Sequence, residues 1–200
     1  MAPLNEDQLK DIREERKIQI MNAAMKVFAN NGIKLTKISM IAKEAKVSHG
    51  LVYHYFNSKE EVLFQSLEWA METATMEAAF QELNNMPMSP LEKIKHFTTF
   101  ALSEGNSDVF RVIQHVTKSE DIPQHISELI EQSGKMYLEF LYPLFAEGQE
   151  TGEIYKGDTQ ELLETYLNIL SGIMSEDLQW WKQNIDQKVN ILLRMLSSKK

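Results

Sequence analysis

The sequence contains no cysteine, which removes disulfides and thiolate metal sites from the chemistry open to the protein. No apolar run approaches the roughly 18 residues that a membrane-spanning helix needs. The charged stretch 1–17 also lacks the apolar segment of a signal peptide. With 43% hydrophobic residues among 200, the chain can still bury one good core or two small ones. These features predict a cytoplasmic protein with no membrane partner.

Sustained alternation of apolar and polar residues, the pattern of β-strands, is absent as well. Every clear periodicity is helical, and turn-forming residues such as those at 30–32, 84–87 and 152–158 separate the periodic segments. The sequence therefore predicts an all-α fold of about nine helices. They cover about 8–31, a short segment capped by Thr36, 48–55, 58–83 with a capping box of Ser58 and Glu61, 90–104, 108–118, 123–150, 158–184 and 185–197.

The chain as a whole lacks an excess of positive charge, since its net charge is −8. Its amino-terminal part is nevertheless basic. Residues 1–60 hold ten Lys or Arg against seven Asp or Glu, so the remaining residues must carry −11. Phosphate binding depends on local charge, which is screened within about 10 Å at 0.1 M salt. An amino-terminal segment that binds DNA is therefore compatible with a distant acidic body.

The segment 38–56 is the most informative part of the sequence. Apolar residues at 38, 41, 42 and 45 share one helical face, and Ser48 can cap a second short helix. In that second helix Val52 and Phe56 turn inward with Val47. The side chains that remain free are those of His49, Tyr53, His54 and Tyr55. One face held by a small core and another free to enter a major groove is the arrangement that a helix-turn-helix requires.

At these residues the chain resembles the tetracycline-repressor (TetR) family of bacterial transcription regulators. The resemblance covers roughly residues 14–64, and its short motifs stand at fixed distances from one another. They are Ile41-Ala42, Val47-Ser48-x-Gly50, Tyr53-x-Tyr55-Phe56 and Ser58-Lys59-Glu60-Glu61. The resemblance implies a helix-turn-helix DNA-binding domain of three helices over 1–57. It implies a helical domain for effector binding and dimerisation over 58–200.

Two groups of residues are candidates for contact with a double-stranded operator. Tyr53, His54 and Lys59 correspond to family positions that meet phosphates, and Thr36 and Ser48 can add neutral donors. Base reading falls to the leading part of the second helix. The readers there are His49 for guanine, Gly50 for close approach and Leu51 for a thymine methyl, with Lys37 and Ser39 as secondary candidates.

Departures from the family pattern also occur within this segment. Lys46 occupies a turn position where glycine is common, so strain is expected there. Lys37 replaces a frequent threonine, and His49 stands where a longer basic side chain is common. These differences affect which operator is read, and the fold is expected to survive them.

Aromatic and methionine side chains are dense in the second part of the chain, where a helical core accounts for most of them. The resemblance implies that some of these side chains line a pocket for a small hydrophobic effector. Binding of the effector is then expected to shift the fourth predicted helix, residues 58–83, and so to release the DNA. The expected lining residues are Phe97, Phe100, Phe110, His115, Tyr137 and Phe140. No cofactor and no metal are expected.

The last two predicted helices share one apolar template. Helices that are apolar over so much of their circumference need partners on two sides, and a second subunit can provide one of them. An ordinary intrachain core is the alternative explanation, but the resemblance favours a homodimer through these helices. The template residues are Leu162, Tyr166, Ile169, Leu170 and Ile173, and then Ile185, Val189, Leu192, Leu193 and Leu196.

Two other classes of function remain as alternatives to a ligand-responsive repressor of a palindromic operator, for which an activator is a variant. An enzyme is disfavoured because His125 and Glu128 have neither a third ligand nor a nucleophile–base set beside them, and no glycine-rich phosphate loop is present. A helical protein-interaction module without sequence-specific DNA binding is the second alternative. Saturable, salt-dependent binding to an operator distinguishes the regulator from such a module.

Overall fold

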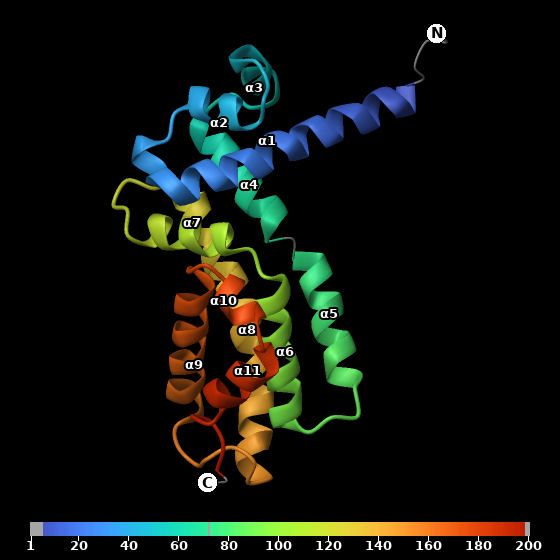
Figure 1. Cartoon of the computed structure of the whole chain (residues 1–200), viewed down its shortest axis with the longest axis vertical. Coiled ribbons are helices and arrows are strands. Elements are labelled where there is room, and N and C mark those ends of the chain that lie inside the picture. Colours follow the sequence, from blue (N-terminus) through green and yellow to red (C-terminus); the bar gives the residue numbers. More distant parts are fainter. Residues whose placement is uncertain (1–5, 72, 199–200) are drawn as a thin grey trace. The chain divides into compact units, whose positions relative to one another are not determined.

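The computed structural model describes residues 6–71 and 73–198, and its regular structure is helical throughout this part of the chain. A single isolated bridge joins Ile154 to Ser197. The elements, shown in Figure 1, are α1 (Glu6–Leu35), α2 (Ile38–Glu44), α3 (His49–Tyr55), α4 (Lys59–Ala70), α5 (Thr73–Asn85), α6 (Pro90–Glu104), α7 (Ser107–Thr117), α8 (Gln124–Glu150), α9 (Thr159–Met174), α10 (Gln179–Lys182) and α11 (Ile185–Leu193).

The all-α fold class is confirmed, although the described residues form eleven helices where about nine are expected. Two predicted helices are interrupted. The range 58–83 is divided between α4 and α5, and the range 158–184 between α9 and α10. In the second case Ser175 is the C-cap of α9, and its hydroxyl donates to the Gly172 carbonyl at 2.7 Å. The Asp177 side chain accepts the Gln179 N–H at 2.9 Å in the turn that follows. Local bonds between side chains and backbone therefore form a turn where periodicity alone would continue the helix.

The predicted end of the first helix is present as a break within α1. Gly32 has φ 71° and ψ 168°, so the chain leaves helical geometry there before one further turn to Leu35. A side chain at this position would be strained by the positive φ, although its Cβ would meet the nearby His115 ring only at an ordinary contact distance of 3.7 Å. Glycine thus ends the helix as its sequence position predicts.

The chain forms two compact units, which are described separately. The first contains the described part of residues 1–71 together with 111–127, and the second contains the described part of 72–110 together with 128–200. The first unit takes in α4 and most of α7 beside the three helices of the predicted DNA-binding domain. The functional boundary between residues 57 and 58 stays a prediction.

In the first unit α1 packs against α2 and α4, and α2 packs against α3. Ile20 and Phe28 of α1, Ile41 of α2 and Val52 of α3 are fully buried, and Phe56 directly after α3 is 1% exposed. Burial of a side chain of this size contributes about 1.5–3 kcal/mol relative to exposure. The short helices α2 and α3 are therefore held by a shared core that neither could form alone.

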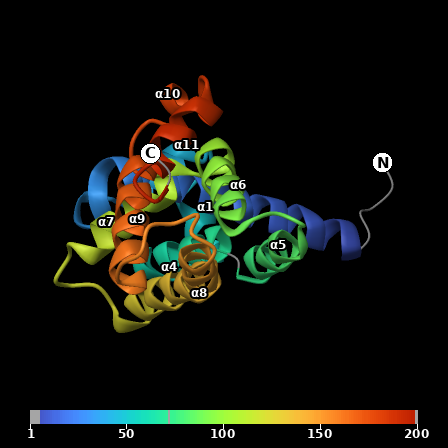
Figure 2. The same ribbon diagram turned by 90° about the horizontal axis from the view of Figure 1, so that it is seen from below.

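The second unit is built around an apolar core that joins α5, α6, α8, α9 and α11. Figures 1 and 2 show α5 beside α6, and α10 and α11 pack against α6. Tyr166 of α9 is fully buried, and its hydroxyl lies 2.8 Å from the hydroxyl of Thr98 in α6. Burial raises the pKa of the Tyr166 phenol far above its ordinary value. No described helix combines the length and apolarity needed to cross a bilayer.

Candidate DNA-binding site

Helix α3 begins at a cap that the sequence predicts. The Ser48 side chain accepts the Leu51 N–H at 3.1 Å, which satisfies one of the free donors at the helix start. Because the Ser48 oxygen accepts this bond, its hydroxyl hydrogen remains available to donate outward. Ser48 can therefore fix the helix and contact a phosphate at the same time.

The free face of α3 presents aromatic and imidazole groups. Tyr53 is 49% exposed, and His49 and His54 are exposed as well. The His49 and Tyr53 rings meet edge to face with 5.0 Å between their centroids, which orients both side chains. A Cβ built on Gly50 meets nothing within 4 Å, so this stretch of backbone is open to close approach. Leu51 is half-buried at the side of this face.

The opposite face of α3 is anchored by Val52, and Val47 in the preceding turn is only half-buried. The predicted inward orientation of Val52 and Phe56 is confirmed. Tyr55 is half-buried, and its ring lies between those of His54 and Phe56 at 5.3 and 6.4 Å between centroids. The division into a held face and a free face is what insertion of α3 into a major groove requires.

The turn between α2 and α3 contains the strained residue that the sequence predicts. Lys46 has φ 54°, a left-handed conformation that glycine adopts more readily. The turn is also tied to α1, because the Gln19 side chain donates to the Ala45 carbonyl at 2.7 Å. This contact between distant residues is not visible in any sequence pattern.

The predicted cap of α2 is wrong. Lys37, and not Thr36, occupies the N-cap position, and no side chain caps this helix. The Thr36 side chain is 2% exposed and donates its hydroxyl to the Gly32 carbonyl at 2.7 Å. Its hydroxyl is therefore used within the protein, and only its backbone stays near the start of α2. Lys37 and Ser39 are exposed and remain available as secondary contacts.

Lys59 opens α4 after the Ser58 cap, which accepts the Glu61 N–H at 3.1 Å. The predicted capping box is half formed, because the Glu61 carboxylate binds the Asn57 N–H and not that of Ser58. The Lys59 ammonium donates to the Ile33 carbonyl at 2.9 Å. An ammonium has three donors, so one bond to a carbonyl leaves others for an anion.

The six predicted effector residues fall into separate groups, and their role in effector binding stays a prediction. Phe97, Tyr137 and Phe140 belong to one aromatic cluster of the second unit, with ring centroids 6.1–6.4 Å from Phe97. Sequence reasoning left out its fourth member, Phe80, which stacks on Phe140 at 4.0 Å. The burial of Phe80 could have been predicted, because Phe80 and Leu83 are three residues apart and so share one face of a helix. Burial raises the pKa of Tyr137 above its usual value.

The other three expected lining residues have different surroundings. Phe100 is on the solvent side of α6 and is 53% exposed. His115 belongs to the first unit, where its Nε2 lies 3.1 Å from the Ala29 carbonyl oxygen. Phe110 is half-buried against the core of the second unit. Helical periodicity placed these residues on helices but did not give the direction in which each side chain faces.

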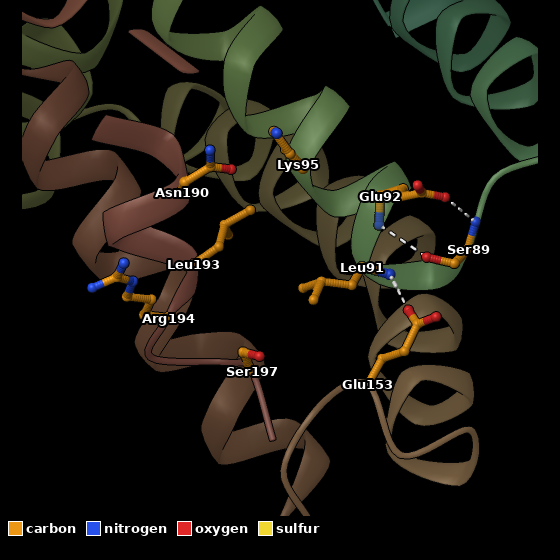
Figure 3. A pocket seen from close by; sticks show the side chains of 9 residues that line it. All are labelled: Ser89, Leu91, Glu92, Lys95, Glu153, Asn190, Leu193, Arg194 and Ser197. Atoms are coloured by element: carbon orange, nitrogen blue, oxygen red, sulfur yellow. Dashed lines mark hydrogen bonds between the residues drawn. The ribbon is translucent and has the colours of Figure 1, made fainter. Parts of the chain in front are cut away.

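The second unit also contains an open cavity of about 490 Å³ between the start of α6 and α11. Figure 3 shows that Glu153 faces the start of α6, where it accepts the Leu91 N–H at 3.1 Å. Glu92 closes a capping box with Ser89, so both carboxylates serve the helix start. None of the six predicted effector residues lines this cavity. Its lining consists of Ser89, Leu91, Glu92, Lys95, Glu153, Asn190, Leu193, Arg194 and Ser197.

His125, which with Glu128 was the candidate pair for a metal-dependent enzyme, packs against an aromatic side chain. The His125 ring meets Phe64 edge to face at 4.9 Å. Within residues 6–71 and 73–198, no three His, Cys, Asp or Glu side chains gather closely enough to hold a metal ion.

Comparison with known proteins agrees with this geometry. Residues 20–65 match the sequence profile of the bacterial regulatory proteins, tetR family. The chain is 29% identical over 183 residues to the Fatty acid metabolism regulator protein of Bacillus subtilis (strain 168), covering 88% of this chain and 87% of that protein. Residues 20–65 therefore form a domain of the tetR family, and they contain all of α2 and α3. The chain is thus a DNA-binding transcriptional regulator.

Two further similarities extend the comparison. The regulator is 40% identical over 108 residues to the HTH-type transcriptional regulator HbdR of Aromatoleum sp. (strain CIB), but this match spans only 46% of HbdR and 53% of the present chain. Its fold is similar to that of the transcriptional regulator FadR from Bacillus subtilis in complex with stearoyl-CoA. That similarity has a TM-score of 0.62 at 26% identity and covers 91% of this chain and 98% of that one.

Proposed function

We propose that the regulator is a repressor that binds a palindromic operator as a homodimer and is released by an apolar effector. The observation that carries the DNA-binding part is the free face of α3, with His49, Gly50 and Tyr53 on a helix held by Val52. Phosphate contacts are assigned to Ser48, Tyr53, His54 and Lys59. A role at DNA also supports action in the cytoplasm.

Selection from a random duplex library tests base reading by α3. We expect the unaltered protein to select a palindrome, and His49→Ala to change the preference at one or two positions by about 1–3 kcal/mol each. His54→Ala is the matched control, because it removes the same kind of side chain from a position assigned to phosphate. It should weaken binding to all duplexes without altering the selected motif. Identical motifs for the unaltered protein and His49→Ala would remove His49 from the readers.

Dimerisation is proposed through the apolar faces of α9 and α11. Large apolar side chains remain exposed here in the single chain, with Ile169 at 38% and Ile191 at 57%. Gly172 on α9 has open space around its Cβ position, which permits another backbone to approach closely. Two α3 helices must reach successive major grooves about 34 Å apart, and a fixed pairing of subunits sets that distance.

An acyl-CoA is the effector class that we propose, because FadR of Bacillus subtilis, which resembles the regulator over nearly its whole length, forms a complex with stearoyl-CoA. The aromatic cluster of Phe80, Phe97, Tyr137 and Phe140 offers an apolar surface for the acyl chain. The Phe80 and Phe140 rings are stacked at 4.0 Å, so an acyl chain has to separate them. A ligand that binds only the separated arrangement shifts the population of the whole protein, as a two-state switch requires.

Titration of the operator complex with stearoyl-CoA tests the effector class, with free coenzyme A as the negative control. We expect stearoyl-CoA to release the operator, about a hundredfold if it prefers the non-binding state by about 2.7 kcal/mol. Phe97→Leu should raise the stearoyl-CoA concentration needed for half release. Phe100→Leu, the same change on the exposed side of α6, should leave it unaltered. Equal behaviour of the two variants would move the effector site away from the aromatic cluster.

The helical protein-interaction module is not favoured as an alternative. Both curated proteins compared above are regulators by name, and the residues that match the family profile contain the helix-turn-helix.

A further inference from the structure

The first turns of α1 form an arm that precedes the family profile. Residues 8–16 are all exposed, whereas Ile20 further along the helix is fully buried. The family profile begins at residue 20, so this arm lies outside it. Figures 1 and 2 both show the arm extending beyond the helices against which the rest of α1 packs. We define the arm as residues 8–17.

The basic residues of the arm share one face of the helix. With 3.6 residues per turn, Lys10, Arg13, Arg16 and Lys17 fall within a sector of roughly 120°. Asp11, Glu14 and Glu15 occupy the adjoining sector of roughly 100°, in which Glu14 lies one turn from both Lys10 and Lys17. Four cations on one largely exposed face suit a surface that meets a polyanion.

The basic residues of the arm lie on the same face of α1 as the buried residues that follow them. Ile20 and Ala24 lie in the same angular sector of α1, and both are fully buried against the other helices of the first unit. The basic side chains of the arm therefore project on the side where those helices pack, but beyond the end of the core. Figure 1 shows α2 and α3 on one side of α1, with the arm running past them.

One member of the basic sector fixes the base of the arm beside the helix-turn-helix. The Arg16 guanidinium donates to the Gln19 side-chain oxygen at 2.6 Å, and Gln19 in turn donates to the Ala45 carbonyl at 2.7 Å. Ala45 stands in the turn between α2 and α3. Lys10, Arg13 and Lys17 have no hydrogen bond or ion pair within the described residues, so their charges are available.

We propose that the arm binds the phosphate backbone of DNA that flanks the operator half-site, with Lys10, Arg13 and Lys17 as its contacts. This inference rests on the proposed DNA-binding function. Duplex DNA carries one negative charge per about 1.7 Å of its axis, which suits a row of cations spread over about two helical turns. The contacts carry no base information, so the arm adds affinity and salt dependence without changing the sequence that α3 reads.

Two duplexes and two triple variants test the arm. The probes are the palindrome selected by the unaltered protein, embedded with ten base pairs of unrelated sequence on each side, and the same palindrome without flanks. The basic triple variant is Lys10→Gln, Arg13→Gln and Lys17→Gln. The acidic triple variant Asp11→Asn, Glu14→Gln and Glu15→Gln is the matched control on the same turns of the same helix. Circular dichroism establishes that both variants keep their helix content.

On the flanked duplex we expect the basic triple variant to lower the log–log salt slope by about 2.7, since each phosphate contact contributes about 0.9. The ratio of the affinity of the unaltered protein to that of the basic triple variant then falls roughly 40-fold between 50 and 200 mM salt. On the duplex without flanks the two proteins should bind almost equally. The acidic triple variant should bind the flanked duplex at least as tightly as the unaltered protein.

Equal salt slopes for the basic triple variant and the unaltered protein on the flanked duplex would overturn the proposal for the arm. Equal losses on both duplexes would also overturn it, because the arm would then act within the half-site or through the fold. Failure of the unaltered protein to select any duplex has a different meaning. That result would remove the proposed operator binding itself, and with it the arm as a DNA contact.

Discussion

At the scale of single residues, Lys59 shows how one side chain can serve both the fold and the site. Its position at the start of α4 predicts a phosphate contact, and its ammonium also lies 2.9 Å from the Ile33 carbonyl oxygen. That carbonyl lies beside the break at Gly32, where the regular bonds of α1 are interrupted. A cation that satisfies a carbonyl at a helix end is a favourable arrangement.

The variant Lys59→Met keeps an apolar stem and removes the ammonium, with both its charge and its hydrogen-bond donors. We expect the free energy of unfolding to fall by about 1 kcal/mol, because the Ile33 carbonyl loses its donor in a half-buried place. We also expect the log–log salt slope of DNA binding to fall by about 0.9. Urea unfolding measures the first quantity and a salt titration of operator affinity the second.

Lys34→Met is the control for Lys59, since Lys34 lies at the same small cavity but is exposed. It should leave stability unchanged. An unaltered salt slope for Lys59→Met would take Lys59 out of the phosphate contacts, while unaltered stability would show that its bond to Ile33 contributes nothing.

At the scale of secondary-structure elements, α3 is too short to be stable by itself. Helices below about 12 residues are marginal in water, and α3 has seven. Its stability comes from the burial of Val52, the neighbouring Phe56 and the cap at Ser48. The surface that reads DNA therefore depends on contacts that do not touch DNA.

Changes at Ser48 separate capping from phosphate contact. Ser48→Ala removes the cap, and we expect it to cost about 1 kcal/mol of stability and to weaken operator binding. Ser48→Asp retains a capping oxygen but adds a negative charge, so it should keep stability and still weaken operator binding. Thermal unfolding and operator titration of both variants are the measurements. A stable Ser48→Asp variant with full operator affinity would exclude a phosphate near this residue.

Helices α6 and α9 are joined in the core of the second unit by a pair of hydroxyl groups. Thr98 donates its hydrogen to the Ile94 carbonyl at 2.6 Å, so Tyr166 is the donor in the 2.8 Å bond between the two hydroxyls. Ionisation of this phenol in the folded protein would leave a buried charge. This explains why burial raises the pKa of Tyr166.

The raised pKa of Tyr166 predicts a loss of stability at alkaline pH. A tyrosine ionises in the unfolded chain near its ordinary pKa of 10.0 but stays protonated when folded. Its contribution is thus complete below pH 10 and decreases above it, by about 1.4 kcal/mol per pH unit. Urea unfolding between pH 8 and 11 should show a smaller decrease for Tyr166→Phe than for the unaltered protein. Tyr142→Phe, at a tyrosine that is 47% exposed, should behave like the unaltered protein.

At the scale of the whole molecule, the acidic balance of the chain limits how it binds DNA. A net charge of −8 with a basic excess only in residues 1–60 weakens non-specific binding and leaves affinity dependent on specific contacts. Two properly spaced copies of α3 multiply those contacts, because the second half-site is bound at high effective concentration. The proposed dimer therefore decides operator affinity as much as any single contact.

Ile191→Glu tests the proposed dimer surface. A carboxylate on an exposed apolar position of α11 should be harmless to the single chain but unfavourable inside an apolar interface. We expect sedimentation to give a monomer and operator affinity to fall by more than tenfold. Asn190→Glu adds the same charge on another face of α11, beside the cavity, and should leave the dimer intact. A dimeric Ile191→Glu variant would place the subunit contact elsewhere.

Local patterns predicted the elements that depend on neighbouring residues. The helical periods, the break at Gly32, the caps at Ser48 and Ser58, and the strained turn at Lys46 are all present in the structure. The functional segment was accessible in the same way, because α2 and α3 are contiguous and the division of their faces follows from spacing alone. Fold class and the DNA-reading helix could therefore be predicted.

Contacts between distant residues could not be predicted, because spacing along a chain does not give direction in space. Only tertiary structure turned the Thr36 hydroxyl inward, joined Lys59 to Ile33 and stacked Phe80 on Phe140. It also tied Gln19 to Ala45, which positions the arm of α1 beside the helix-turn-helix. The sequence alone determined which helices form, since that depends on local propensity and periodicity. Packing decided which side chains remain free to bind, since burial and hydrogen bonding depend on what lies opposite.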